Sequence, residues 1–94
     1  MHAVVITVTI DESTADPDST MIQDQIIPNL RQIPGFVAGY WLEPTGGKAL
    51  SVVFFESEEV ARQTADNMGV TPGASPAPGV TFETVEFTGV AVSS

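Results

Sequence analysis

The stretch that decides the fold is residues 33–57, which read IPGFVAGYWLEPTGGKALSVVFFES. It contains two runs rich in β-branched and aromatic side chains, residues 36–43 and residues 49–56. Such side chains favour an extended backbone. The segment Pro44-Thr45-Gly46-Gly47 between the runs is a strong turn signal. We therefore predict two strands joined as an antiparallel hairpin by a loop of about four or five residues.

On the N-terminal side of this hairpin, residues 3–10 alternate in the manner of a strand. Successive side chains of a strand point to opposite faces. One face consists of Val4, Ile6, Val8 and Ile10, and the other of Ala3, Val5, Thr7 and Thr9. Neither face carries a charge, so we expect both to be covered.

A helix is expected between this strand and the hairpin. Asp16 followed by Pro17 is typical of an N-cap and a first helical residue. Pro28 has no N–H to donate to the Asp24 carbonyl, so we predict a kink there. Pro34-Gly35 ends the helix. Its apolar face is formed by Ile22, Ile26, Leu30 and Ile33.

On the C-terminal side, Ser57 is the predicted N-cap of a second helix, which Gly69 ends. Its apolar stripe is Val60, Ala61, Ala65 and Met68. Residues 69–79 contain three prolines and three glycines. They form a long loop, and such loops are either mobile or functional. Residues 80–92 are expected as a last strand, in which the change of parity between Phe82 and Val85 indicates a bulge.

The predicted order is βαββαβ, which is an α+β, ferredoxin-like plan with a four-stranded antiparallel sheet and both helices on one face. We treat residues 1–94 as a single domain. A small domain without cysteine has few ways to gain stability other than a second subunit. The strands also offer apolar side chains on the face that the helices leave free. We therefore expect a homodimer in which two sheets pack face to face.

The segment from Ile33-Pro34-Gly35-Phe36 to Trp41, followed by residues 50–57, resembles the dimeric α+β barrel superfamily. It is most similar to small bacterial proteins near the antibiotic-biosynthesis monooxygenase domains, and the resemblance covers nearly the whole chain. It implies a cavity between the helices and the sheet. Members include cofactor-independent oxygenases, haem-degrading enzymes, lactone isomerases and proteins without an assigned activity, so the resemblance supports the fold better than an activity.

The formal charge of −9 limits the partners of this chain. The chain has three basic and twelve acidic residues, and phosphate backbones repel carboxylates. Nucleic acid and an anionic membrane surface are therefore not expected as partners. No apolar run reaches the length of about 20 residues that a bilayer span needs. The absence of cysteine suits a reducing compartment, and we expect a cytoplasmic protein.

Tyr40 and Trp41 are the main candidates for ligand binding. They are adjacent in a predicted strand, so one faces the helices and the other the dimer interface. An aromatic wall binds planar molecules, and the Trp41 N–H can orient an oxygen atom. The alternative is that both residues serve packing. Arg31 could anchor a carboxylate or phenolate of a ligand, whereas Arg62 is expected to pair with Glu58.

Asn67 and Asn29 complete the candidates. Oxygenases of the resembled superfamily often use an asparagine with a tryptophan, which makes Trp41, Asn67 and Asn29 candidate catalytic residues by resemblance. The alternative is that both asparagines serve the backbone at a helix end and at a kink. His2 is the single histidine and lies outside both predicted helices, so no haem is expected. The carboxylates Asp11, Glu12, Asp16 and Asp18 match no calcium loop.

Two functions remain open at this point, and so does the question of whether the chain is an enzyme. One is a small-molecule binder or cofactor-independent monooxygenase-like protein, whose ligand would be small and apolar or aromatic. The alternative is a non-catalytic homodimeric structural or protein-interaction domain. A binder needs an internal cavity of roughly 300 Å³ or more. In a structural dimer Ile22, Ile26, Leu30, Val60 and Met68 would fill that space. No metal or cofactor is expected in either case.

Overall fold

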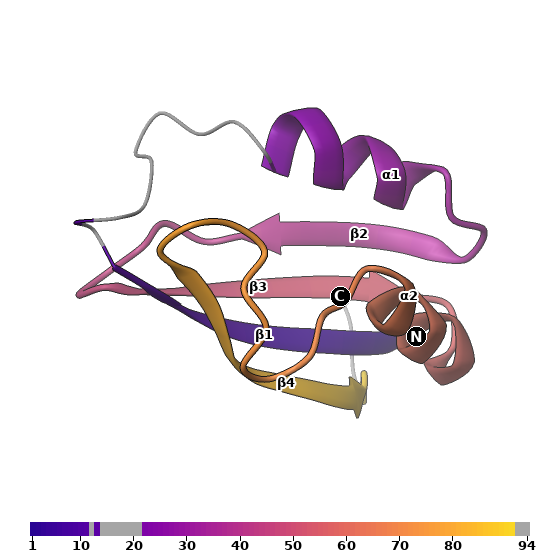
Figure 1. The fold of residues 1–94 in the computed structure, drawn as a ribbon. Coiled ribbons are helices and arrows are strands. Elements are labelled where there is room, and N and C mark those ends of the chain that lie inside the picture. The colour runs from indigo at the N-terminus through magenta and orange to yellow at the C-terminus, as the bar shows by residue number, and fades with distance from the viewer. Residues whose placement is uncertain (12, 14–21, 92–94) are drawn as a thin grey trace.

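A computed structural model describes residues 1–11, 13 and 22–91. The predicted helix start at Asp16 and Pro17 lies outside these residues, as do Glu12 and Asp18 of the acidic loop. The elements are β1 (His2–Ile10), a π-helical turn η1 (Ile22–Ile26), α1 (Ile27–Arg31), β2 (Phe36–Trp41), β3 (Lys48–Phe55), α2 (Glu58–Asn67) and β4 (Val80–Gly89), drawn in Figure 1.

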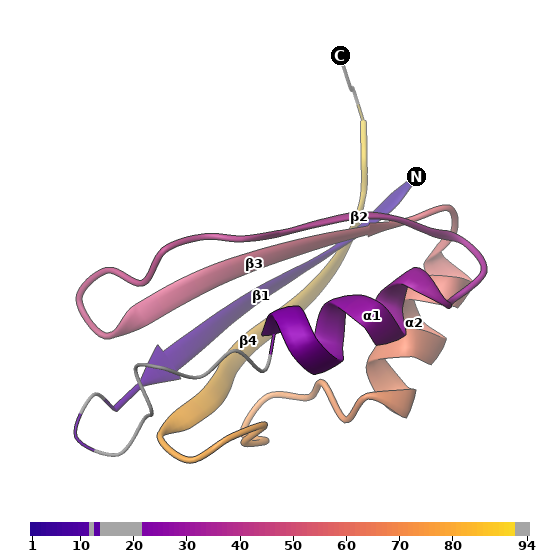
Figure 2. The same ribbon diagram turned by 90° about the horizontal axis from the view of Figure 1, so that it is seen from above.

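The four strands form one antiparallel sheet in the order β2-β3-β1-β4. The two central strands are β3 and β1, and the two edge strands are β2 and β4. Both helices lie on the same face of this sheet, as Figure 2 shows. The predicted α+β class, the order of the elements along the chain and the four-stranded antiparallel sheet are thereby confirmed.

The β2–β3 hairpin closes through a tight turn. Gly46 and Gly47 both have positive φ, at 61° and 77°, a conformation that glycine adopts without strain. Thr45 and Lys48 exchange two backbone hydrogen bonds across these glycines, of 2.8 and 3.2 Å. Strand β2 ends at Trp41, before the predicted residue 43, because the chain then runs into Pro44, which has no N–H for a ladder bond.

The first helical region differs from the kinked helix that we predict. It consists of the π-helical turn η1 followed by the short helix α1, and Pro28 lies in the first turn of α1. A proline there loses little, because the first N–H groups of a helix have no partner within it. The irregular turn η1 therefore lies just before Pro28. The absence of an N–H group on this proline breaks no hydrogen bond within a regular helix.

Helix α2 is capped at both ends as predicted. The Ser57 Oγ accepts a hydrogen bond of 3.3 Å from the Val60 N–H. At the other end Gly69 has φ +68°, and its N–H bonds to the Asp66 carbonyl. The Val70 N–H bonds to the Ala65 carbonyl at 2.9 Å, which completes a Schellman motif.

The predicted bulge in the last strand is confirmed. Thr7 pairs with Thr84 but the next residue, Val8, pairs with Phe82, so Glu83 is the extra residue. The strand ends at Gly89, before the predicted residue 92. Part of the 69–79 loop folds back on β4, where the Gly73 N–H bonds to the Phe82 carbonyl and the Phe82 N–H to the Ala74 carbonyl. This loop is thus tied to the edge of the sheet.

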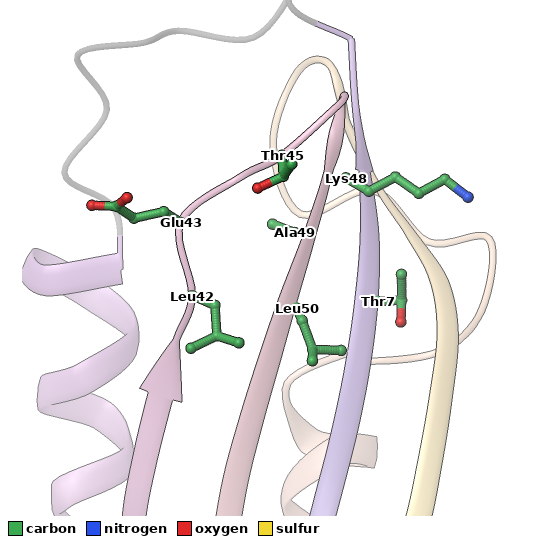
Figure 3. A pocket seen from close by; sticks show the side chains of 7 residues that line it. All are labelled: Thr7, Leu42, Glu43, Thr45, Lys48, Ala49 and Leu50. Carbon is green, nitrogen blue, oxygen red and sulfur yellow. The ribbon is translucent and has the colours of Figure 1, made fainter.

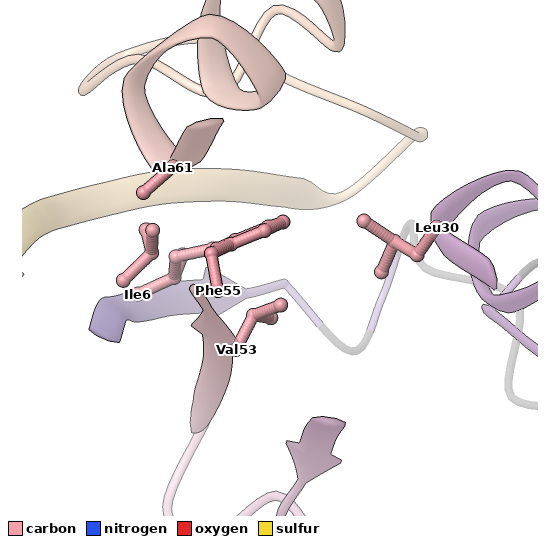
Figure 4. Packing of buried hydrophobic residues seen from close by; sticks show 6 residues of the cluster. Ile6, Leu30, Val53, Phe55 and Ala61 are labelled. Carbon is pink, nitrogen blue, oxygen red and sulfur yellow. The ribbon is translucent and has the colours of Figure 1, made fainter. Parts of the chain in front are cut away.

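The core lies between the sheet and the helices. Phe55 on β3 and Leu30 on α1 are only 2% and 3% exposed, and Ala61 brings α2 close to the sheet (Figure 4). Phe36 packs edge-on against Phe55, with ring centres 6.1 Å apart. The other buried members of the cluster are Val4, Ile6 and Val53.

Candidate functional site

Trp41 lies on the helix side of the sheet. It pairs with the buried Ser51 across the ladder and packs against the core cluster. Its ring extends back over Gly39, since a Cβ added at Gly39 would lie 2.6 Å from Trp41 Cη2. The sequence separates Trp41 from Tyr40 but leaves open which of them faces the helices, and the structure answers this. Trp41 is half-buried in packing contacts.

Tyr40 lies on the opposite side, which we call the open face because neither helix covers it (Figure 2). The residue is 59% exposed. It pairs with Val52, and its ring packs edge-on against Phe54 with 6.2 Å between ring centres. The two candidate ligand-binding aromatics are therefore separated by the sheet, and they cannot line one cavity in this chain.

Side chains of the described residues pack into the space between helices and sheet, where we expect a small-molecule cavity. Leu30 is buried, and Ile26, Val60 and Met68 pack against the same cluster. These are four of the five residues expected to fill it in a structural dimer; the side chain of the fifth, Ile22, lies outside the described part. These four residues therefore occupy part of the space in which an internal ligand site is expected.

A depression of about 260 Å³ lies instead at the hairpin end of the open face (Figure 3). It is open to solvent. Leu42 follows the end of β2, Leu50 lies on the neighbouring β3, and the Lys48 side chain extends across β1 toward β4. Its lining is completed by Thr7, Glu43, Thr45 and Ala49. None of these seven residues is among the predicted site residues, because from the sequence we expect a ligand on the helix side.

The remaining candidates do not converge on this depression or on Trp41. Asn29 and Arg31 are exposed on α1, and Asn67 is exposed as the last residue of α2. The Asn29 backbone carbonyl accepts a hydrogen bond from the Gln32 N–H at the helix end. His2 is half-buried, because it begins β1 between Phe55 and Gly89. The catalytic and ligand-binding roles of these residues stay predictions.

Two clusters of charged side chains flank the sheet. Arg62 bonds to Glu58 at 2.8 Å, as predicted, and also lies 4.5 Å from the centre of the Phe87 ring. The hydrogen bond from Arg62 and its positive charge lower the pKa of Glu58. On the open face, Glu83 accepts hydrogen bonds from Lys48 and Thr9, both of 3.1 Å. The hydrogen bond from Lys48 has the largest effect in lowering the pKa of Glu83, and the bond from Thr9 lowers it further.

The open face is divided between apolar and polar residues. Tyr40, Leu42 and Leu50 are 59%, 52% and 37% exposed. We call their part of the face the apolar lane; it consists of Val5, Ala38, Tyr40, Leu42, Leu50, Val52 and Phe54. The part over β4 is the polar stripe, which consists of Thr81, Glu83, Thr84, Glu86 and Thr88. Sequence reasoning predicts the lane but misses the stripe, whose residues are all exposed.

Neither metal chemistry nor a membrane span gains support from the described residues. Within residues 1–11, 13 and 22–91, no three histidine or acidic side chains lie close enough together to hold a metal ion. None of the helices in that part of the chain has the length and apolar character needed to cross a bilayer. The comparisons with known proteins give no assignment either: no family model, no curated protein and no solved structure matches the chain.

Proposed function

We propose that the chain is a non-catalytic, homodimeric domain whose two copies pack through the open faces of their sheets. The observation that carries this proposal is the apolar lane, where Tyr40, Leu42 and Leu50 are each more than a third exposed. Contiguous apolar patches on a soluble domain mark interaction sites. Fully burying one such side chain contributes roughly 1.5–3 kcal/mol. Two copies would bury six of them, besides the half-buried Val5, Val52 and Phe54.

The size of the open face suits a second copy. Four strands spaced about 4.8 Å apart and up to about 30 Å long give a flat area on the order of 550 Å². A standard interface buries about 800 Å² of accessible surface on each partner, and side chains make accessible area larger than flat area. The lane is also the part of this face without charge, so two acidic chains can approach there without opposing like charges.

The fold assignment belongs to the same proposal. The element order and the central position of β1 and β3 suit a ferredoxin-like domain, and face-to-face packing of two such sheets gives the dimeric α+β barrel arrangement. This arrangement would place Tyr40 at the interface and Trp41 on the helix side. Cytoplasmic location stays a prediction from the sequence.

A small-molecule binder is the second candidate, and the depression beside Leu42 and Leu50 favours it. A partner sheet packed on the open face would enclose this volume, which is about 260 Å³ and close to the size of a small ligand site. Enclosure would leave Thr7, Glu43, Thr45 and Lys48 as its polar groups. A cofactor-independent monooxygenase reaction gains less support, because Asn29 and Asn67 are exposed whereas Trp41 packs against the core.

Light scattering coupled to size separation tests the proposal. Loaded at tens of micromolar, the chain is expected to give twice its monomer mass, and dilution is expected to shift it toward the monomer. A monomer mass at every concentration would contradict the proposal. Addition of a library of small apolar and aromatic compounds in a thermal-shift assay tests the second candidate, since a ligand at 100 times its dissociation constant adds about 2.7 kcal/mol.

A further inference from the structure

We infer that the contact between the two copies is confined to the apolar lane of β2, β3 and β1, and that the polar stripe of β4 stays outside it in water. This inference rests on the proposed homodimer and specifies which part of the open face the dimer uses. It follows from the register of the sheet, from the charges on β4 and from the way in which the edge of β4 is protected.

The register arranges the open face in rows that run from apolar to polar. Directly paired residues of neighbouring strands share a face. One row runs from Leu50 through Thr7 to Thr84. The next runs from Tyr40 and Val52 through Val5 to Glu86. The first row becomes polar at Thr7 on β1 and the second at Glu86 on β4, so both rows are polar where they reach β4.

Charge opposes burial of the stripe. Glu83 and Glu86 are exposed carboxylates, and a two-fold interface over β4 would bring in both residues from both copies. Removing an ionised carboxylate from water costs several kcal/mol unless a close partner compensates it. Lys48 is bonded to Glu83 and is the basic group on this part of the sheet. One lysine per copy cannot compensate two carboxylates, so the stripe is more stable in water.

The geometry of β4 agrees with a strand that faces solvent. A bulge at Glu83 interrupts its pairing with β1. Hydrogen bonds from Gly73 and to Ala74 cover part of its outer edge at Phe82. Bulges and covered edges are the devices that keep an exposed strand from pairing with another chain. These features oppose extension of the sheet at β4, so the copies are expected to meet through a sheet face and not edge to edge at this strand.

A contact confined to the lane also has an expected size. Three of the four strands contribute, so the buried area lies toward the small end of the usual range. Because the polar stripe stays outside the contact, its carboxylates remain in water, where salt screens their charges over about 8–10 Å at physiological ionic strength.

Leu50 and Thr84 provide a matched pair of sites for a test, because both pair with Thr7 in the same row on the same face. Each is exposed, so a glutamate at either position is compatible with the folded monomer. In sedimentation experiments, Leu50→Glu is expected to weaken the dimer at least tenfold, and Thr84→Glu is expected to change its dissociation constant less than twofold. Circular dichroism and thermal melting show whether both variants fold.

A second readout does not depend on adding charge. The chain has no cysteine, so Leu50→Cys and Thr84→Cys each introduce a single thiol. Under reducing conditions, maleimide labelling of Leu50→Cys is expected to slow at least fivefold as the protein concentration rises through the dimer range. Labelling of Thr84→Cys is expected to be independent of concentration.

The results of these experiments distinguish an error about the extent of the contact from an error about the dimer itself. If Thr84→Glu also dissociates the dimer and its cysteine counterpart is protected, the copies meet over the whole face, and the inference is overturned while the dimer stands. A dimer that neither glutamate variant weakens would use another surface and would contradict both. A wild-type chain that stays monomeric contradicts the dimer itself, and the lane would then serve a different partner.

Discussion

The indole of Trp41 lies against the backbone at Gly39, so closely that a Cβ at position 39 would be 2.6 Å from Cη2 and 2.8 Å from Cζ3. The two residues are on the same face of β2, two positions apart. Gly39 therefore provides the space into which the ring packs on the helix side. The sequence motif that resembles a known superfamily therefore contains two residues that pack against each other, and this packing requires no ligand.

Gly39→Ala is accordingly expected to destabilise the folded chain by about 1–3 kcal/mol, the usual cost of overpacking a filled site. Chemical unfolding measures the change. In a background of Trp41→Leu, which lacks the clashing ring atoms, the same alanine substitution is expected to cost much less. Equal costs in both backgrounds would show that the ring does not occupy this position.

The pKa of Glu83 provides a second prediction. Bonds from Lys48 and Thr9 hold it below its ordinary value of 4.5 in the folded chain. As the pH falls, the unfolded chain therefore binds this proton first, and stability is lost as the pH passes from the unfolded pKa through the folded one. Above that range the contribution is fully present.

The comparison of wild type with Glu83→Gln tests this. Between pH values of about 5.5 and 3, wild type is expected to lose more stability than the variant, because the variant has no carboxylate to protonate at this position. An NMR titration of the Glu83 carboxyl group is expected to give a pKa below 4.5. A pKa at or above that value would show that Lys48 does not hold the carboxylate in solution.

Local sequence signals predicted several parts of the fold correctly, because each is decided within a few residues. The paired glycines Gly46 and Gly47 specify a turn with positive φ, and the Ser57 hydroxyl caps the helix that follows it. The parity change that predicts the bulge at Glu83 is likewise readable from the strand itself. In such cases the backbone leaves few alternatives.

Other features depend on how separate elements meet. Alternation places Tyr40 and Trp41 on opposite faces, but only helix docking decides which of them is covered. The polar stripe is visible in the spacing of Thr84, Glu86 and Thr88, yet its position beside the apolar lane follows from the pairing of β4 with β1. The depression beside Leu50 similarly requires the pairing of β1 with β3 and the course of residues 42–45.

The net charge of −9 leads to a prediction about salt. Two acidic copies repel each other, and an uncharged lane has no ion pairs that salt would weaken. Raising the salt concentration from about 50 mM to about 500 mM is therefore expected to lower the dissociation constant of the dimer severalfold. Sedimentation at fixed protein concentration measures it. A dimer that weakens with salt would indicate ion pairs between the copies.

The central claim is that a second copy covers the open face. The most direct measurement is an isotope-filtered NOE experiment on a mixture of ¹³C-labelled and unlabelled chains, which detects only contacts between copies. We expect NOEs from the methyl groups of Leu42 and Leu50 to protons of the other chain, with the Tyr40 ring among them. Their absence in a sample shown to be dimeric, with intermolecular NOEs from the helices instead, would contradict the claim.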